Sequence, residues 1–128
     1  MKLRATLLIA AICALFYVFL SLRVILTRFR GEKLAVGSEA DPELQMRIRM
    51  HGNFAEYVPF ALLLMGFLEV SGANPERLYW FGGLLIAARI AHVIGLPLKP
   101  PNPWRAFGIT VTLGVLIAES LYAFTLLR

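Results

Sequence analysis

Residues 47–59 read Arg-Ile-Arg-Met-His-Gly-Asn-Phe-Ala-Glu-Tyr-Val-Pro and lead directly into the apolar stretch 60–68. In an α-helix, four of these side chains recur at i, i+4, i+7 and i+8 and share one face, namely Arg49, Asn53, Glu56 and Tyr57. A charged residue at the centre of a bilayer costs about 2.5–3.5 kcal/mol, so such residues usually serve a binding site or a water-filled cavity. This helix face is the strongest functional signal in the chain.

The composition indicates an integral membrane protein. The chain has 128 residues, of which 59% are hydrophobic, and its mean hydropathy is +0.70, whereas a soluble domain is about 45–50% apolar. Because a membrane-spanning helix needs about 20 apolar residues, four such helices would use most of the chain. The length fits one domain, and we treat residues 1–128 as a single integral membrane domain.

Apolar segments and turn residues predict where the helices lie. We expect four helices, separated by a polar connection at 28–42, a turn at 71–75 and a proline-rich connector at 97–103; the helices fall at about 5–27, 42–70, 76–96 and 104–127. Asp41 is the expected N-cap of the second helix, and Pro59 predicts a kink within it. Short connections favour antiparallel neighbours, so the predicted fold is all-α, a four-helix transmembrane bundle of up-down-up-down topology.

The first apolar segment is expected to be a retained membrane span rather than a cleaved signal peptide. Its uncharged run from Ala5 to Leu22 has 18 residues and is rich in bulky side chains, whereas a signal sequence has about 7–15 apolar residues before small ones. Cys13 is the one cysteine of the chain and lies within this run. An intrachain disulfide is therefore excluded, and we expect Cys13 to be a packing residue.

The net charge of +5 and the pI near 9.9 are interpreted as membrane signals. Basic residues gather at the ends of apolar segments, and no signature of a nucleic-acid-binding fold is present, so nucleic acid is not an expected partner. One side of the membrane would carry Lys2, Arg4, Arg77 and Arg128. The other would carry Arg28, Arg30, Lys33, Arg47, Arg49, Lys99 and Arg105. This asymmetry predicts that the first and third connections face the cytoplasm and that both termini lie outside it.

Arginines from several helices should meet the polar face of the second helix. In an antiparallel bundle, the end of the first helix, the start of the second, the end of the third and the start of the fourth lie on one side of the membrane. Arg28, Arg89 and Arg105 occupy these positions. Arginine suits recognition of carboxylates, and a buried glutamate can hold an ammonium group. The residue types fit a small zwitterionic ligand with an excess of carboxylate.

The same residues also allow structural interpretations. Arg47 and Arg49 could serve only to set membrane orientation. Glu56 could form an ion pair with Arg89 that ties two helices together. Glu119, toward the opposite side of the membrane, could be a structural partner or a subunit contact.

The two histidines occupy different positions relative to the polar face. His51 projects about 200° around the helix from Arg49, so we expect a separate role for it. His92 follows Arg89 by three residues and could point into the same cavity. No HxxxH or HExxH spacing is present, and no metal site is predicted.

The segment 49–59, Arg-Met-His-Gly-Asn-Phe-Ala-Glu-Tyr-Val-Pro, resembles the second-helix signature of the MAPEG family, the membrane-associated proteins of eicosanoid and glutathione metabolism. The family pattern has Arg, Asn, Glu, Tyr and Pro at these offsets, and all five positions agree. The rest of the chain is similar in layout, with four spans, a basic end to the first helix and an arginine late in the third. The specific part of the resemblance covers about a dozen residues.

The resemblance implies a four-helix bundle that assembles as a homotrimer, with glutathione bound as co-substrate between subunits. An arginine near the start of the family's fourth helix activates the thiol, and Arg105 is the matching candidate for this catalytic role; a neighbouring cation stabilises a thiolate. The candidate glutathione-binding residues are Arg49, Asn53, Glu56, Tyr57, Arg28, Arg89 and His92.

The chain departs from the family pattern in the third helix, where residues 89–96 contain no tyrosine. The leading hypothesis is a membrane-embedded glutathione transferase or peroxidase-like enzyme that attacks a lipophilic electrophile entering from the bilayer. The alternative is a non-catalytic protein of the same type that binds a lipid or a partner. A transporter or channel subunit ranks below both, because the polar residues cluster near one side. A multi-pass protein of a bacterial inner membrane is the expected location.

Overall fold

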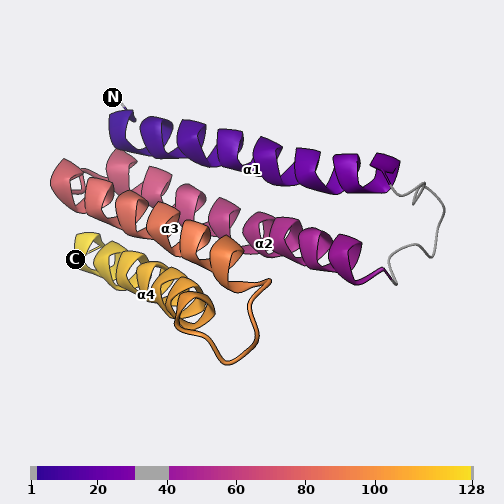
Figure 1. Ribbon diagram of the computed structural model, residues 1–128. Coiled ribbons are helices and arrows are strands. Elements are labelled where there is room, and N and C mark those ends of the chain that lie inside the picture. The colour runs from indigo at the N-terminus through magenta and orange to yellow at the C-terminus, as the bar shows by residue number, and fades with distance from the viewer. Residues whose placement is uncertain (1–2, 31–40, 128) are drawn as a thin grey trace.

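The computed structural model describes residues 3–30 and 41–127, and within these ranges it consists of four α-helices (Figure 1). They are α1 (Arg4–Arg30), α2 (Pro42–Val70), α3 (Pro75–Gly95) and α4 (Pro103–Leu126). The number, order and approximate bounds of the predicted helices are confirmed. Most of the predicted first connection lies outside the described residues, as do Lys2, Lys33 and Arg128 of the charge count.

Three of the four helices begin in the same way, with a polar N-cap residue, Asp or Asn, followed by proline. The side-chain oxygens of Asp41, Asn74 and Asn102 accept hydrogen bonds from backbone N–H groups in the first turns of α2, α3 and α4. Proline suits the next position because its fixed φ is already helical and its missing N–H leaves no hydrogen bond unmade. The predicted cap at Asp41 is confirmed, and the same chemistry sets the starts of α3 and α4.

All four helices are long and apolar enough to cross a membrane. Large apolar side chains cover much of the outside of the bundle, including Leu7 at 70%, Phe60 at 70% and Phe124 at 64% exposure. A bilayer solvates such a surface, whereas water would not. The predicted fold class, an all-α four-helix transmembrane bundle, is confirmed. Pro59 lies inside α2, which continues to Val70, and the expected kink stays a prediction.

The helices pack chiefly in two pairs, α1 with α2 and α3 with α4. Within the described residues α1 and α4 do not touch, and they lie on opposite sides of α2 and α3 (Figure 1). At one end of the bundle, the carboxylate of Glu69 in α2 accepts hydrogen bonds from the backbone N–H groups of Ala5 at 2.9 Å and Thr6 at 2.8 Å. Because the first N–H groups of a helix lack partners within that helix, Glu69 secures α1 to the bundle.

At the other end, α1 and α3 finish while α2 and α4 begin (Figure 1). We call this the groove end, because a groove opens there between α2, α3 and α4. Here α3 and α4 approach closely at two glycines. A Cβ atom at Gly95 would meet the backbone of Arg105, and a Cβ atom at Gly108 would lie 2.8 Å from the carbonyl oxygen of Ala88 and from the backbone of His92. Glycine at these positions lets the two backbones come together.

We expect Gly108→Ala to destabilise the bundle and Gly114→Ala, on the same helix, to leave it unchanged or more stable. The methyl group at 108 meets backbone atoms, and such overpacking costs about 1–3 kcal/mol. At Gly114 nothing lies within 4 Å, and alanine is the better helix former. Thermal unfolding in detergent, followed by tryptophan fluorescence, measures the difference. Equal melting temperatures for the two variants would contradict the tight α3–α4 contact at Gly108.

Candidate functional site

Arg89 on α3 ties three helices together at the groove end. Its side chain is 2% exposed. Its Nη1 donates a hydrogen bond to Oδ1 of Asn53 on α2 at 2.6 Å, and its Nη2 donates to the carbonyl oxygen of Gly108 at 3.1 Å and to Oγ1 of Thr112 at 2.6 Å, both on α4. A planar guanidinium can donate in several directions at once. Arg89 therefore fixes the spacing of α2, α3 and α4.

The positive charge of Arg89 is not matched by a carboxylate among the described residues. Its hydrogen-bond acceptors are neutral, and the Tyr57 ring lies 6.0 Å from Cζ, within the range of a weak cation–π contact. The Nε atom is buried with no partner. Because charges act over longer distances in apolar surroundings, Arg89 makes its neighbourhood favourable for an anion.

An open groove of about 380 Å³ lies beside this network, between α2, α3 and α4. It is lined by Ile48, Arg49, Gly52, Asn53, Glu56, His92, Leu96, Arg105 and Ile109. The volume lies within the range of small-molecule sites in proteins, about 300–1,000 Å³. Five of the predicted site residues, from three helices, thus line one groove.

The charged groups in this groove are unpaired within the described part of the chain. Arg49 and Glu56 are exposed on α2, and Arg105 is half-buried on α4. No hydrogen bond or ion pair joins their side chains to any described residue. The groove therefore offers two guanidinium groups and one carboxylate to a ligand.

The tie between α2 and α3 is not the ion pair of Glu56 with Arg89 that the sequence allowed. Arg89 bonds to Asn53, and Glu56 is left exposed to the groove. Arg89 itself does not line the groove, because its side chain is turned into the bundle. Asn53 connects the buried network of Arg89 with the groove, since it accepts a hydrogen bond from Arg89 and also lines the groove.

His92 and Tyr57 take different positions around the groove. His92 is 5% exposed and lines the groove from α3. Tyr57 lines a smaller adjacent cavity of about 70 Å³, together with Asn53, Arg89 and Thr112. The two cavities share Asn53, so a ligand in the groove would lie beside the tyrosine rather than directly against it.

Arg28 and His51 lie away from the groove. Arg28 is on the last turn of α1, and α1 contributes no residue to the groove within one chain. His51 stacks on Tyr17 of α1 with 4.6 Å between ring centroids. The separate position expected for His51 is thus observed.

Glu119 on α4 is fully enclosed, with 0% exposure, and neither carboxylate oxygen has a hydrogen-bond partner among the described residues. A side chain without accessible surface cannot form a contact with another chain. The interpretation of Glu119 as a subunit contact is therefore wrong for this arrangement.

Sequence reasoning missed Gly108 and Thr112, which hold Arg89 in place. Both lie one helical turn apart on a segment that is otherwise strongly apolar, and Thr112 also donates from Oγ1 to the carbonyl oxygen of Gly108 at 2.7 Å. A buried threonine four residues after a glycine was the available signal. It did not reveal which arginine these residues would meet.

Comparisons with known proteins identify the family of the chain. The model of the MAPEG family matches residues 6–125. The inner membrane protein YecN of Escherichia coli strain K12 is 38% identical over 80 residues, which cover 62% of this chain and 60% of YecN, and YecN of Escherichia coli O6:H1 gives the same figures. The match thus spans less than two thirds of the length of these relatives.

No solved structure gives a significant match to the chain. The family model, by contrast, covers all four helices and the complete polar face of α2. A bundle of four apolar helices with this coverage shows that the chain is a membrane protein that belongs to the MAPEG family.

Proposed function

We propose that this protein binds glutathione in the groove between α2, α3 and α4 and activates its thiol for attack on a lipophilic electrophile. The function is that of a membrane-embedded glutathione transferase or peroxidase-like enzyme. The observation that carries the proposal is the groove itself, in which Arg49, Glu56 and Arg105 stand unpaired.

The charges of the groove complement those of glutathione. The tripeptide carries two carboxylates, one ammonium group and a thiol. Arg49 can bind a carboxylate through two parallel hydrogen bonds, and Glu56 can accept from the ammonium group. The unmatched charge of Arg89 adds to the attraction for a ligand with net negative charge.

Arg105 is the proposed catalytic residue. It lies in the first turn of α4 and lines the groove beside His92. A guanidinium group next to the thiol favours the thiolate, which is the nucleophilic form. The thiolate would then attack the electrophilic atom of a substrate that enters from the bilayer.

We propose a homotrimer because the face of α2 that carries the site is unsuited to lipid. Arg49 and Glu56 are exposed on this membrane helix, and a Cβ atom added to Gly52, between them, would meet nothing within 4 Å. Charged groups cost free energy in lipid, and small residues let another helix approach closely. We further propose that a second copy covers this face and brings Arg28 of its α1 to the groove.

The proposed location is the bacterial inner membrane, with both termini outside the cytoplasm. The relative from Escherichia coli is named an inner membrane protein. The basic residues at the groove end include Arg28, Arg30 and Lys99, and such residues favour the cytoplasmic side.

A non-catalytic protein that binds a lipid or a partner is the second candidate. The observation that favours it is the lack of tyrosine in the groove: α3 presents His92 there, and Tyr57 is turned into the adjacent cavity. A thiol in the groove would therefore have no phenol as a hydrogen-bond donor.

We expect Arg105→Ala to lower the rate of glutathione conjugation to a chlorodinitrobenzene by about 10²-fold, because a preorganised cation at the developing charge contributes about that much. The purified protein in detergent is assayed by absorbance. Arg30→Ala, which removes the same charge at the same end outside the groove, is the control and should keep its activity. Full activity of Arg105→Ala would overturn the catalytic role of this residue.

We expect glutathione to bind the wild-type protein and to bind Glu56→Gln at least about tenfold more weakly, because the neutral amide cannot compensate the ligand's ammonium group. Isothermal titration calorimetry at millimolar glutathione measures both. Absence of heat and of any thermal shift with the wild-type protein would exclude glutathione as the ligand, and the non-catalytic function would then be the remaining candidate.

We expect mixed oligomers to recover activity if Arg28 serves the groove of a neighbouring subunit. Chains with Arg28→Ala and chains with Arg105→Ala are each expected to be inactive alone. Coexpressed at equal amounts, they should regain roughly a quarter of the wild-type activity, because that share of interfaces pairs an intact Arg28 with an intact Arg105. No recovery would mean that Arg28 does not act across a subunit boundary.

A further inference from the structure

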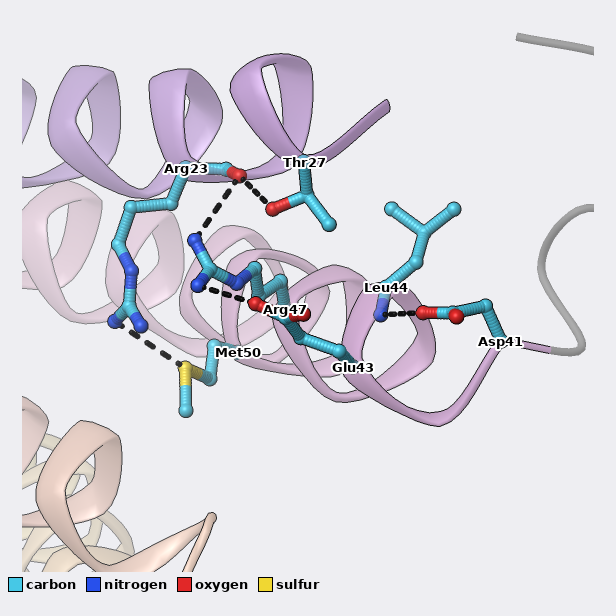
Figure 2. A network of polar contacts seen from close by, with 7 residues as sticks. All are labelled: Arg23, Thr27, Asp41, Glu43, Leu44, Arg47 and Met50. Atoms are coloured by element: carbon cyan, nitrogen blue, oxygen red, sulfur yellow. Dashed lines mark hydrogen bonds and ion pairs between the residues drawn. The ribbon is translucent and has the colours of Figure 1, made fainter. Parts of the chain in front are cut away.

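A second group of basic residues lies at the groove end but outside the groove, where α1 packs against α2 (Figure 2). It consists of Arg23 on α1 and Arg47 on α2, with Glu43 and Met50 beside them. None of these four residues lines the groove of the proposed enzyme. The proposed enzymatic function therefore does not account for the contacts of these four residues.

Arg47 holds the two helices together. Its Nη2 forms an ion pair with Oε1 of Glu43 at 2.6 Å, and its Nη1 donates to the backbone carbonyl of Arg23 at 3.4 Å. Its Nε atom is buried with no partner. Glu43 is thus engaged by Arg47 and is the acidic side chain of this group.

Arg23 forms no hydrogen bond or ion pair with a carboxylate among the described residues. Its Nη1 lies 3.9 Å from the thioether sulfur of Met50, which is a weak acceptor, and its Cζ lies 5.7 Å from the centre of the Phe19 ring. Figure 2 shows its side chain crossing from α1 toward α2 rather than extending along α1 past Thr27 to the helix end. The charges of Arg23 and Arg47 are close enough to repel each other, and Glu43 is close enough to attract Arg23, so these three side chains together carry one surplus positive charge.

The depth of Arg23 in the membrane follows from its place along α1. Arg23 lies seven residues before Arg30, the last residue of α1, which is about 10 Å along the helix. The 27 residues of α1 span about 40 Å, against a hydrocarbon core of about 30 Å. When α1 is centred in the bilayer, about 5 Å of it projects at each end, so the Cα atom of Arg23 lies about 5 Å inside the hydrocarbon boundary, a distance that a long arginine side chain can span to reach the headgroups.

We propose that Arg23 and Arg47 bind the phosphate group of an anionic phospholipid at the contact between α1 and α2. A phosphate supplies the acceptor oxygens that Arg23 lacks here, and its negative charge balances the surplus positive charge of Arg23, Arg47 and Glu43. Basic pockets between transmembrane helices are suited to anionic headgroups. The bound lipid would secure α1 to α2 at the groove end, as Glu69 does at the opposite end.

The test uses the full-length protein, purified in a neutral detergent and titrated with phosphatidylglycerol or phosphatidylcholine, with native mass spectrometry as the readout. Wild-type protein is expected to bind phosphatidylglycerol about tenfold more tightly than phosphatidylcholine. Equal binding of the two lipids would overturn the proposal. This comparison needs no variant, so it stands even if a substitution prevents folding.

Arg23→Gln is compared with Arg30→Gln, which removes one charge near the same end but leaves Arg23 and Arg47 in place. Arg23→Gln should lower the affinity for phosphatidylglycerol about tenfold, and Arg30→Gln should change it less than about twofold. Equal losses in both variants would mean that only the net charge of the surface matters, against the proposal.

Inorganic phosphate and glycerol 3-phosphate are added as competitors to distinguish a lipid from a free phosphate. At millimolar concentrations neither should displace phosphatidylglycerol, since the acyl chains add apolar contact area. Displacement by either competitor would identify a site for a soluble anion and would overturn the assignment to a lipid.

Discussion

The arrangement of the groove end depends on one buried cation, Arg89. Its guanidinium reaches Asn53 on α2 and both Gly108 and Thr112 on α4. A buried arginine that lost these acceptors would be left unsatisfied in an apolar bundle, at a cost of several kcal/mol. The three helices that form the groove are therefore held at a spacing that keeps Arg89 bonded.

This use of Arg89 leaves other polar groups available. Because the Nη groups of Arg89 donate to neutral oxygens, no carboxylate is bound to Arg89, and Glu56 stays exposed to the groove with Arg49 and Arg105. The proposed enzymatic function depends on this division between a structural arginine and free ones. A pairing of Arg89 with Glu56 would have removed the acidic group of the groove.

The two proposals assign different anions to the same end of the bundle. Glutathione would occupy the groove between α2, α3 and α4, whereas a lipid phosphate would lie between α1 and α2. In both places arginine is the recognising residue, since its planar group binds carboxylate and phosphate through paired hydrogen bonds. Arg47 belongs to the proposed lipid site rather than to the groove, although it lies only two residues from Arg49, because residues two apart face different sides of a helix.

The sequence by itself determined the four helices, since the repeated pattern of N-cap and proline at 41–42, 74–75 and 102–103 and the apolar length between these pairs are local properties. It also placed Arg49, Asn53 and Glu56 on one face, because helical periodicity fixes that relation. Only the tertiary structure decided which partner each polar group meets. Whether Arg89 bonds to Asn53 or to Glu56 depends on how α2, α3 and α4 are placed against one another, and the packing of helices is not encoded in the spacing of residues along any one of them.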